Sequence, residues 1–273
     1  FYFFPKVWQE YLVERKNNNM QNKENNLIRL NSVEVNFDGF KAVNEFNFGV
    51  SAGELRCLIG PNGAGKTTVL DIICGKTKSS KGNIIFNGED ITNKEEFIIS
   101  RKGVGRKFQI PSVFKELTVK ENLYVALNSS LSFFNNIIKF FNPLDQKKID
   151  EIAEFVGLKD DLDKQAQFLS HGQTQWLEIA LVVLKDPSLI LMDEPTAGMT
   201  NYETSQTVEL FNKLKESHTL IVVEHDMGFV KEIGDIVSVM HEGKLLAEGE
   251  TKEIENNEKV KEAYLGNKGI TNA

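Results

Sequence analysis

Eight consecutive residues have the types and order that a phosphate-binding loop requires. They read G-x-x-x-x-G-K-T and comprise Gly60, Pro61, Asn62, Gly63, Ala64, Gly65, Lys66 and Thr67. The glycines let the backbone curl with its N–H groups directed inward, and these donors form a cradle for polyphosphate with the positive end of a following helix. Lys66 can reach the β- and γ-phosphates, and the Thr67 hydroxyl is suited to bind Mg²⁺.

Two adjacent carboxylates and a histidine follow other predicted strands. Asp193 and Glu194 come after the apolar run 188–192, and His225 comes soon after the run 219–223. Since the carboxyl ends of parallel strands meet at one edge of a sheet, we expect these side chains to face the phosphate loop. The aspartate is suited to hold Mg²⁺ through water, the glutamate to polarise an attacking water, and the histidine to reach a γ-phosphate.

The run Leu-Ser-His-Gly-Gln at residues 169–173 stands just before a predicted helix. Ser170 is suited to cap that helix, and Gly172 permits close approach of the backbone. One interpretation is an ordinary helix start, and the other is a second anion site made of a helix N-terminus and a hydroxyl. In the second case one chain carries two half-sites for phosphate, which predicts that ATP is clamped between two subunits.

Two further residues have open interpretations from their positions alone. Gln109 begins a helical insertion after the predicted strand 104–108, and a lone glutamine carries almost no information. Phe37 precedes the phosphate loop and is either a core aromatic or a platform for a purine ring.

The amino-acid composition limits the classes of protein to which this chain can belong. The chain has 273 residues, of which 41% are hydrophobic and 26% charged, as in an ordinary globular protein. Its net charge of −7 argues against bulk binding to nucleic acid. No run of 18 apolar residues occurs, so we expect another subunit to hold the chain at any membrane where it acts. We expect Cys57 and Cys74 to be reduced, buried and small hydrophobic residues of a cytosolic protein.

Hydrophobic periodicity predicts an α/β fold with a parallel-sheet core, a helical insertion at about 110–170 and an antiparallel edge. The predicted strands are 27–35, 45–50, 55–59, 83–86, 104–108, 188–192, 219–223, 236–240 and 244–247. The predicted helices are 67–74, 119–127, 149–156, 173–184, 202–215 and 227–232.

We divide the chain into an extension at 1–26, a catalytic domain at 27–266 and a tail at 267–273. The extension pairs an aromatic cluster with asparagines, and we expect the native protein to start at Met20. Within the insertion, 131–141 has one largely apolar face. We favour its packing inside the helical subdomain or against a partner, and a membrane-surface helix is the alternative.

The ensemble of these motifs, in this order and spacing, resembles the nucleotide-binding domain of the ABC ATPase family over about residues 27–266. The resemblance implies a P-loop NTPase (RecA-like) core with an antiparallel β-subdomain and an α-helical subdomain. It also implies a head-to-tail dimer that holds two ATP molecules with Mg²⁺ at its interface.

The resemblance assigns a role to each motif. Phe37 would stack on adenine, and residues 62–68, including Thr68, would wrap the triphosphate. Gln109 would sense Mg²⁺ and water and link to the membrane partner. Glu194 would be the general base and His225 would bridge it to the γ-phosphate. The ATP of the opposite subunit would be contacted by Ser170, Gly172 and Gln173, and residues 197–200 would line the dimer seam.

One position departs from the commonest family signature, Ser-Gly-Gly-Gln, because His171 stands at its first glycine. A side chain here must avoid both the phosphate and the helix backbone. Several other runs are similar to ATPases of importers for branched-chain amino acids and urea, among them 105–114, 194–200, 224–227 and 263–266. The run 169–180 is most similar to the urea-importer ATPase, which favours urea import.

The expected partners are transmembrane permease subunits, a second ATPase subunit and, indirectly, a solute-binding protein. The expected location is the cytoplasmic face of the inner or plasma membrane, with the chain peripheral through its permeases. Alternatives are the ATPase of a branched-chain amino-acid importer or of a lipopolysaccharide-export system, a soluble ABC ATPase, and a silent ATP-binding scaffold. The intact Glu194 and His225 argue against the scaffold.

Overall fold

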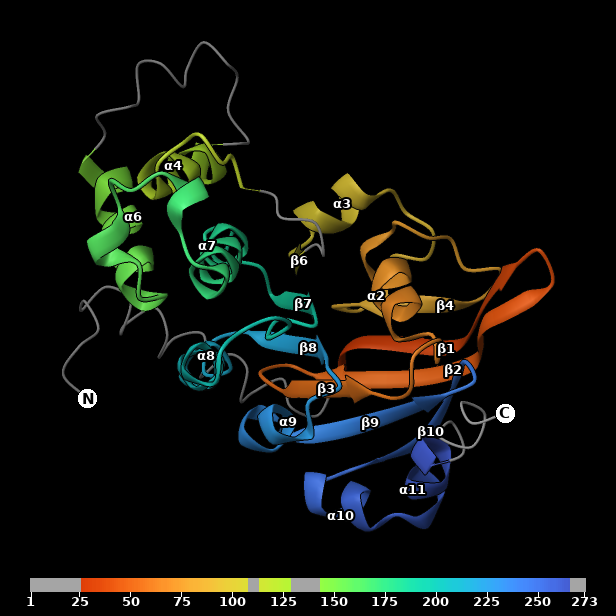
Figure 1. The fold of residues 1–273 in the computed structure, drawn as a ribbon. Helices are drawn as coiled ribbons and strands as arrows, with labels where there is room; N and C mark the ends of the chain where they lie inside the picture. Colours follow the sequence, from red (N-terminus) through yellow and green to blue (C-terminus); the bar gives the residue numbers. More distant parts are fainter. Residues whose placement is uncertain (1–25, 108–112, 129–142, 266–273) are drawn as a thin grey trace.

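The computed structural model describes residues 26–107, 113–128 and 143–265, whose strands form two sheets (Figure 1). The antiparallel sheet has the order β2-β1-β4-β5 and comprises β1 (Asn26–Phe37), β2 (Phe40–Ser51), β4 (Lys81–Phe86) and β5 (Glu89–Asp90). The second sheet has the order β10-β9-β3-β8-β7-β6. Its strands are β3 (Leu55–Ile59), β6 (Val104–Lys107), β7 (Leu189–Asp193), β8 (Thr219–Val223), β9 (Ile236–His241) and β10 (Lys244–Gly249).

The central strands of the second sheet are buried on both faces, because they pair in parallel and are covered on each side. In β3, Leu55, Cys57 and Ile59 pack in one hydrophobic cluster, with the helices at 171–183, 201–214 and 227–233. Leu58 packs in the other cluster, with the helix at 66–74 and the antiparallel sheet. Among the described strands of this sheet, only β10 runs antiparallel, at the edge beside β9. The predicted parallel core and the predicted edge hairpin are therefore confirmed.

Helices cover the sheet and build a separate lobe (Figure 1). They are α2 (Lys66–Cys74), α3 (Glu96–Arg101), α4 (Val119–Asn128), α6 (Pro143–Phe155), α7 (His171–Val183), α8 (Asn201–Leu214), α9 (Met227–Ile233), α10 (Thr251–Asn256) and α11 (Glu258–Leu265). The lobe consists of α4 packed against both α6 and α7, as the predicted helical insertion requires. The segment 131–141, the extension up to residue 25 and the tail 267–273 lie outside the described residues.

Among the described residues, three α-helices were not predicted, namely α3, α10 and α11. They have six, six and eight residues, so each has about two turns or fewer in which to show an apolar period. The strand β2 begins at Phe40, five residues before its predicted start, because the chain turns tightly after β1 at Asp38 and Gly39. Both cysteines are free and buried, as expected.

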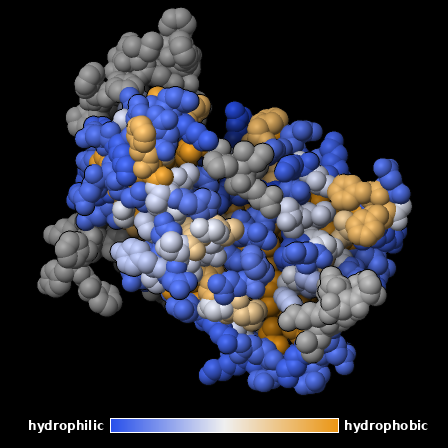
Figure 2. All heavy atoms as spheres, viewed as in Figure 1, coloured by the Kyte–Doolittle hydropathy of each residue, from blue (hydrophilic) through white to orange (hydrophobic). Residues whose placement is uncertain are grey.

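No helix among the described residues is long and apolar enough to cross a bilayer. The face shown in Figure 2 is largely hydrophilic, with an apolar patch at the end of the β1–β2 hairpin. Phe37 and Phe40, which pair across this hairpin end, are 48% and 65% exposed. An exposed aromatic pair beside the phosphate loop is available to contact a ligand.

Candidate functional site

The phosphate loop runs from the end of β3 to the start of α2, as predicted. A Cβ atom on Gly60 would lie 2.2 Å from the Met240 carbonyl oxygen, and one on Gly65 would lie 2.3 Å from the Ala42 carbonyl oxygen. Gly65 also has φ +101°, which favours glycine. The loop is therefore seated between β9 and the β1–β2 hairpin, and this places the hairpin that carries Phe37 beside the loop.

Lys66, the first residue of α2, points back along the loop. Its Nζ donates hydrogen bonds to the carbonyl oxygens of Gly60 at 2.7 Å and Pro61 at 3.0 Å. Burial lowers the pKa of Lys66, while the nearby Glu194 and Asp193 act in the opposite direction. A positive charge at a helix N-terminus, surrounded by backbone donors, fits a polyphosphate.

Asp193 and Thr67 are brought together from β7 and α2. Burial raises the pKa of Asp193, and a hydrogen bond from the Thr67 side chain opposes that shift. The described residues contain no group of three or more histidines, cysteines or acids that could bind a metal. A hydroxyl and one carboxylate nevertheless fit Mg²⁺, which commonly takes few protein ligands and completes its shell with phosphate and water.

Glu194 and His225 meet at the same edge of the sheet. Their Oε1 and Nδ1 atoms are 3.7 Å apart, longer than a hydrogen bond, and their side chains are 40% and 62% exposed. Glu194 has φ +47°, and its N–H donates to the Val223 carbonyl at 2.9 Å, which anchors this left-handed residue to β8. The predicted base and its histidine partner are therefore adjacent and open to a ligand.

Glu224 is a buried carboxylate that the sequence interpretation passed over. Its Oε1 accepts hydrogen bonds from the Thr196 hydroxyl at 2.7 Å and the Thr196 N–H at 3.2 Å, and its Oε2 accepts from the His225 N–H at 3.0 Å. It therefore joins the segment after Glu194 to the segment that carries His225. Its position directly after an apolar strand was the available signal.

Ser170 caps α7 as predicted, through a reciprocal capping box with Gln173. The Ser170 hydroxyl donates to Glu203 at 2.8 Å, and the Gly172 N–H donates to the same carboxylate oxygen at 3.1 Å. His171 avoids the helix backbone by pointing outward, where its Nε2 lies 2.9 Å from the Ala197 carbonyl oxygen. Beyond α7 itself, Ser170, His171 and Gly172 thus contact residues 197–203, the Gln173 side chain donates to Asp161, and none of these partners belongs to the phosphate loop.

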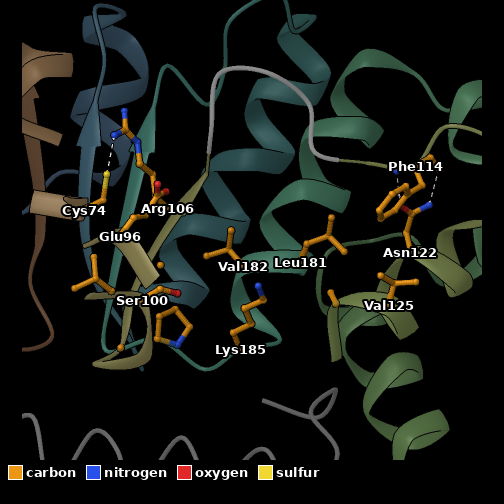
Figure 3. A pocket seen from close by; sticks show the side chains of 15 residues that line it. Cys74, Glu96, Ser100, Arg106, Phe114, Asn122, Val125, Leu181, Val182 and Lys185 are labelled. Carbon is orange, nitrogen blue, oxygen red and sulfur yellow. Dashed lines mark hydrogen bonds between the residues drawn. The ribbon is translucent and has the colours of Figure 1, made fainter. Parts of the chain in front are cut away.

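Gln109 lies outside the described residues, but both flanks of its segment are described. The chain leaves β6 at Lys107 and resumes at Val113, beside a groove of about 330 Å³ (Figure 3). This groove separates the core from the helical lobe, with α3 on one side and α4 and the end of α7 on the other.

Asn122 on α4 holds the backbone of the segment that begins at Val113. It is 2% exposed, accepts from the Phe114 N–H at 2.8 Å and donates to the Phe114 carbonyl at 3.0 Å. The Phe114 ring is left 54% exposed at the rim of the groove. Among the described residues, none that is assigned to the chemical site lines the groove, although its Arg106 acts on Asp193 and opposes the rise that burial causes in the pKa of that carboxyl. The groove is therefore a candidate docking surface next to the chemical site.

Comparisons with known proteins give the family of the chain. A family model described as ABC transporter matches residues 43–197. The chain is 39% identical over 235 residues to "Probable branched-chain amino acid transport ATP-binding protein LivG" of Archaeoglobus fulgidus, covering 84% of this chain and 91% of that protein. It is 36% identical over 249 residues to "High-affinity branched-chain amino acid transport ATP-binding protein LivG" of Escherichia coli (strain K12), covering 88% and 98%.

Solved structures give the same result for the fold. An ATP-binding cassette of an ABC transporter in its ADP conformation superposes with a TM-score of 0.77 at 31% identity, covering 89% of this chain and 99% of the other. A nucleotide-free cassette gives a TM-score of 0.75 at 32% identity, covering 88% and 99%. The predicted fold class is therefore confirmed.

Proposed function

The chain belongs to the ABC transporter family of ATP-binding proteins, and from that premise we propose that it powers an importer of branched-chain amino acids. It is a nucleotide-binding ATPase whose hydrolysis is coupled to transport. The identity of the transported solute is what we propose. It is supported by the names of the relatives reported above, which refer to branched-chain amino acid transport. Urea, favoured by the run 169–180, is not confirmed by any of them and becomes the second candidate.

For ATP hydrolysis we assign the chemistry to the edge formed by β3, β8 and β7. Lys66 and the backbone of residues 60–68 would hold the phosphates, with Phe37 beside the purine. Glu194 would orient and deprotonate the attacking water, and His225, 3.7 Å away, would align that carboxylate with the γ-phosphate. The observation that carries this assignment is the convergence of three separate strand ends on the phosphate loop.

Thr67 and Asp193 would hold Mg²⁺, together with Gln109. When bound, the ion would neutralise phosphate charge. Their own contribution is to fix its place, since the hydroxyl belongs to the rigid first turn of α2 and the carboxylate to a buried strand end.

A second copy, or a related subunit, would supply Ser170, Gly172 and Gln173 to each ATP. Support for this dimer comes from the N-terminus of α7, where the Ser170 hydroxyl and the Gly172 N–H both donate to the Glu203 carboxylate. Donors that bind one anion in this way are competent to bind another. Closure of two such subunits around ATP would then drive the attached permeases, because ATP bridges the closed state better than ADP.

The permease subunits would dock at the groove of Figure 3, which Arg106 and Phe114 line. This docking site is supported by the exposed Phe114, whose backbone is held by Asn122 at the junction of the core and the helical lobe. This docking would keep the chain at the cytoplasmic face of the membrane, and a solute-binding protein would act only through the permeases.

Uptake by a deletion strain of the native host tests the proposal. We expect loss of labelled leucine, isoleucine and valine uptake at limiting concentration, restored by the wild-type gene but not by Lys66→Ala. Urea uptake is measured in parallel and should not change. Loss of urea uptake alone would favour the second candidate, and unchanged uptake of every solute would reject both.

A further inference from the structure

Glu203, in the first turn of α8, lies against the N-terminus of α7. Its Oε1 atom accepts hydrogen bonds from the Ser170 hydroxyl at 2.8 Å and from the Gly172 N–H at 3.1 Å. Its Oε2 atom accepts from the Thr200 N–H at 2.9 Å and the Thr200 hydroxyl at 3.0 Å. The two oxygens therefore serve two different helix ends.

The Glu203 side chain approaches α7 closely and is charged at neutral pH. Hydrogen bonds, first from the Thr200 backbone and then from the Ser170 side chain, lower the pKa of Glu203 to about 2. A Cβ atom on Gly172 would lie 2.5 Å from the Glu203 carboxyl carbon, so the carboxylate sits directly against this glycine. The same donors and the same glycine are those that the proposed dimer uses for the partner's ATP.

We propose that Glu203 is a positioning residue that occupies, within each subunit, the phosphate-binding donors of Ser170 and Gly172 and must release them before ATP bridges two subunits. The inference rests on the proposed function, which assigns these donors to the ATP of the opposite subunit. A carboxylate oxygen and a phosphate oxygen cannot share the two donors, because two anions at hydrogen-bond distance repel strongly.

The hydrogen-bond pattern permits this release. When Oε1 leaves Ser170 and Gly172, Oε2 can keep its bonds to Thr200, so α8 remains capped by its own capping box. The carboxylate also keeps the free donors satisfied in a subunit without a partner. Glu203 thus lowers the fraction of subunits whose Ser170 and Gly172 donors are available to ATP. The apparent affinity for dimerisation is reduced in proportion to that fraction at each of the two ATP sites.

The test measures ATP-driven dimerisation by sedimentation velocity in a Glu194→Gln background, which is expected to retain ATP. Adding Glu203→Gln removes the competing charge, and adding Glu203→Asp keeps the charge but withdraws the carboxylate by one methylene. We expect both to lower the ATP concentration at half-dimerisation, Glu203→Gln by on the order of tenfold. The matched control is Glu209→Gln, an exposed acid on the same helix.

The sign of the effect separates the inference from a structural role. If Glu203 only braces α7 and α8, its loss weakens the dimer, so unchanged or weaker dimerisation of both variants would overturn the inference. ATP binding by the monomer, measured by equilibrium fluorescence, should stay unchanged. If the Glu194→Gln parent itself stays monomeric at saturating ATP, the proposed dimer fails, and the role of Glu203 fails with it.

Discussion

The two predicted phosphate-binding regions of this chain are built in opposite ways. The phosphate loop leaves a fully buried strand, and two of its glycines, Gly60 and Gly65, lie against the backbone of β9 and of the β1–β2 hairpin. The N-terminus of α7 is exposed at Ser170 and is held by side chains, chiefly Glu203 and His171. Backbone packing makes the first region rigid, whereas side-chain hydrogen bonds leave the second one able to exchange partners.

The largest effect is expected where the two regions would act on one ATP. Glu194→Gln removes the charge of the proposed base, which should lower the rate of hydrolysis by roughly 10²–10⁴-fold and trap an ATP-bound dimer. Steady-state phosphate release and sedimentation velocity measure the two effects. Glu232→Gln, an exposed acid on α9, is the control. Normal turnover in Glu194→Gln would falsify the assignment of the base.

A second substitution affects only the phosphate loop. Lys66→Ala removes a cation held among the loop carbonyls, and the loss of charged hydrogen bonds should weaken ATP binding by roughly ten- to a hundredfold. Equilibrium binding of a fluorescent ATP analogue measures this. Lys78→Ala, an exposed lysine in a loose ion pair with Glu95, should bind normally. Equal binding by both variants would remove Lys66 from the site.

Two glycines of the phosphate loop differ in how closely other atoms pack against them, which allows the seating of the loop to be tested. A methyl group at Gly60 would meet the Met240 carbonyl at 2.2 Å, so Gly60→Ala should destabilise the fold by about 3 kcal/mol. At Gly63 no atom lies within 4 Å, and only the left-handed φ of +80° opposes a side chain. Gly63→Ala should therefore cost about 1–2 kcal/mol. Urea unfolding measures both, and equal values would contradict the proposed seating of the loop.

The exposed region should show its dependence on charge when pH is lowered. Because the folded-state pKa of Glu203 is about 2, below its ordinary 4.5, its carboxylate stabilises the fold above pH 4.5. That stabilisation is lost as pH falls from 4.5 through about 2, and solvent screening keeps it under about 1 kcal/mol. The difference in unfolding free energy between wild type and Glu203→Gln should shrink over this range. A difference independent of pH would argue against a charged contact.

The smallest effect is expected at the departure from the common family signature. His171→Gly restores the usual glycine and removes the contact between His171 and the Ala197 carbonyl. One exposed hydrogen bond contributes about 0.5 kcal/mol, so stability should hardly change. Hydrogen exchange should instead quicken in residues 197–200 and stay the same in α11. Unchanged exchange in both places would show that His171 does not hold this loop.

Local patterns were sufficient where one segment determines its own structure. The apolar runs of β3, β7 and β8 predicted buried parallel strands, and Gly60 to Thr67 predicted the turn and the helix start between β3 and α2. Ser170, standing just before a predicted helix, predicted a capped helix start. In each case the backbone requirement lies within a few residues, so periodicity and turn chemistry express it directly.

Other features could not be predicted because distant segments create them. Nothing in the sequence near Glu203 indicates that its carboxylate reaches Ser170, 33 positions away. Likewise, Glu224 holds Thr196 across two strand ends, and Asn122 holds Phe114 beside a groove between core and helical lobe. Such contacts depend on how α7, α8 and the sheet pack, which a single sequence does not express in its local patterns.

The sequence by itself determined the family, the buried strands and the residue types suited to phosphate and proton chemistry, because these depend on short-range periodicity, glycine geometry and side-chain chemistry. The sequence predicted that Asp193, Glu194 and His225 face the phosphate loop, but only the tertiary structure decided their distances and the hydrogen bonds by which Glu224 joins Thr196 to His225. It alone decided that the donors at the start of α7 bind a carboxylate of the same chain. Those contacts join residues far apart in sequence, and their distances are set by the packing of helices on a sheet rather than by any local preference.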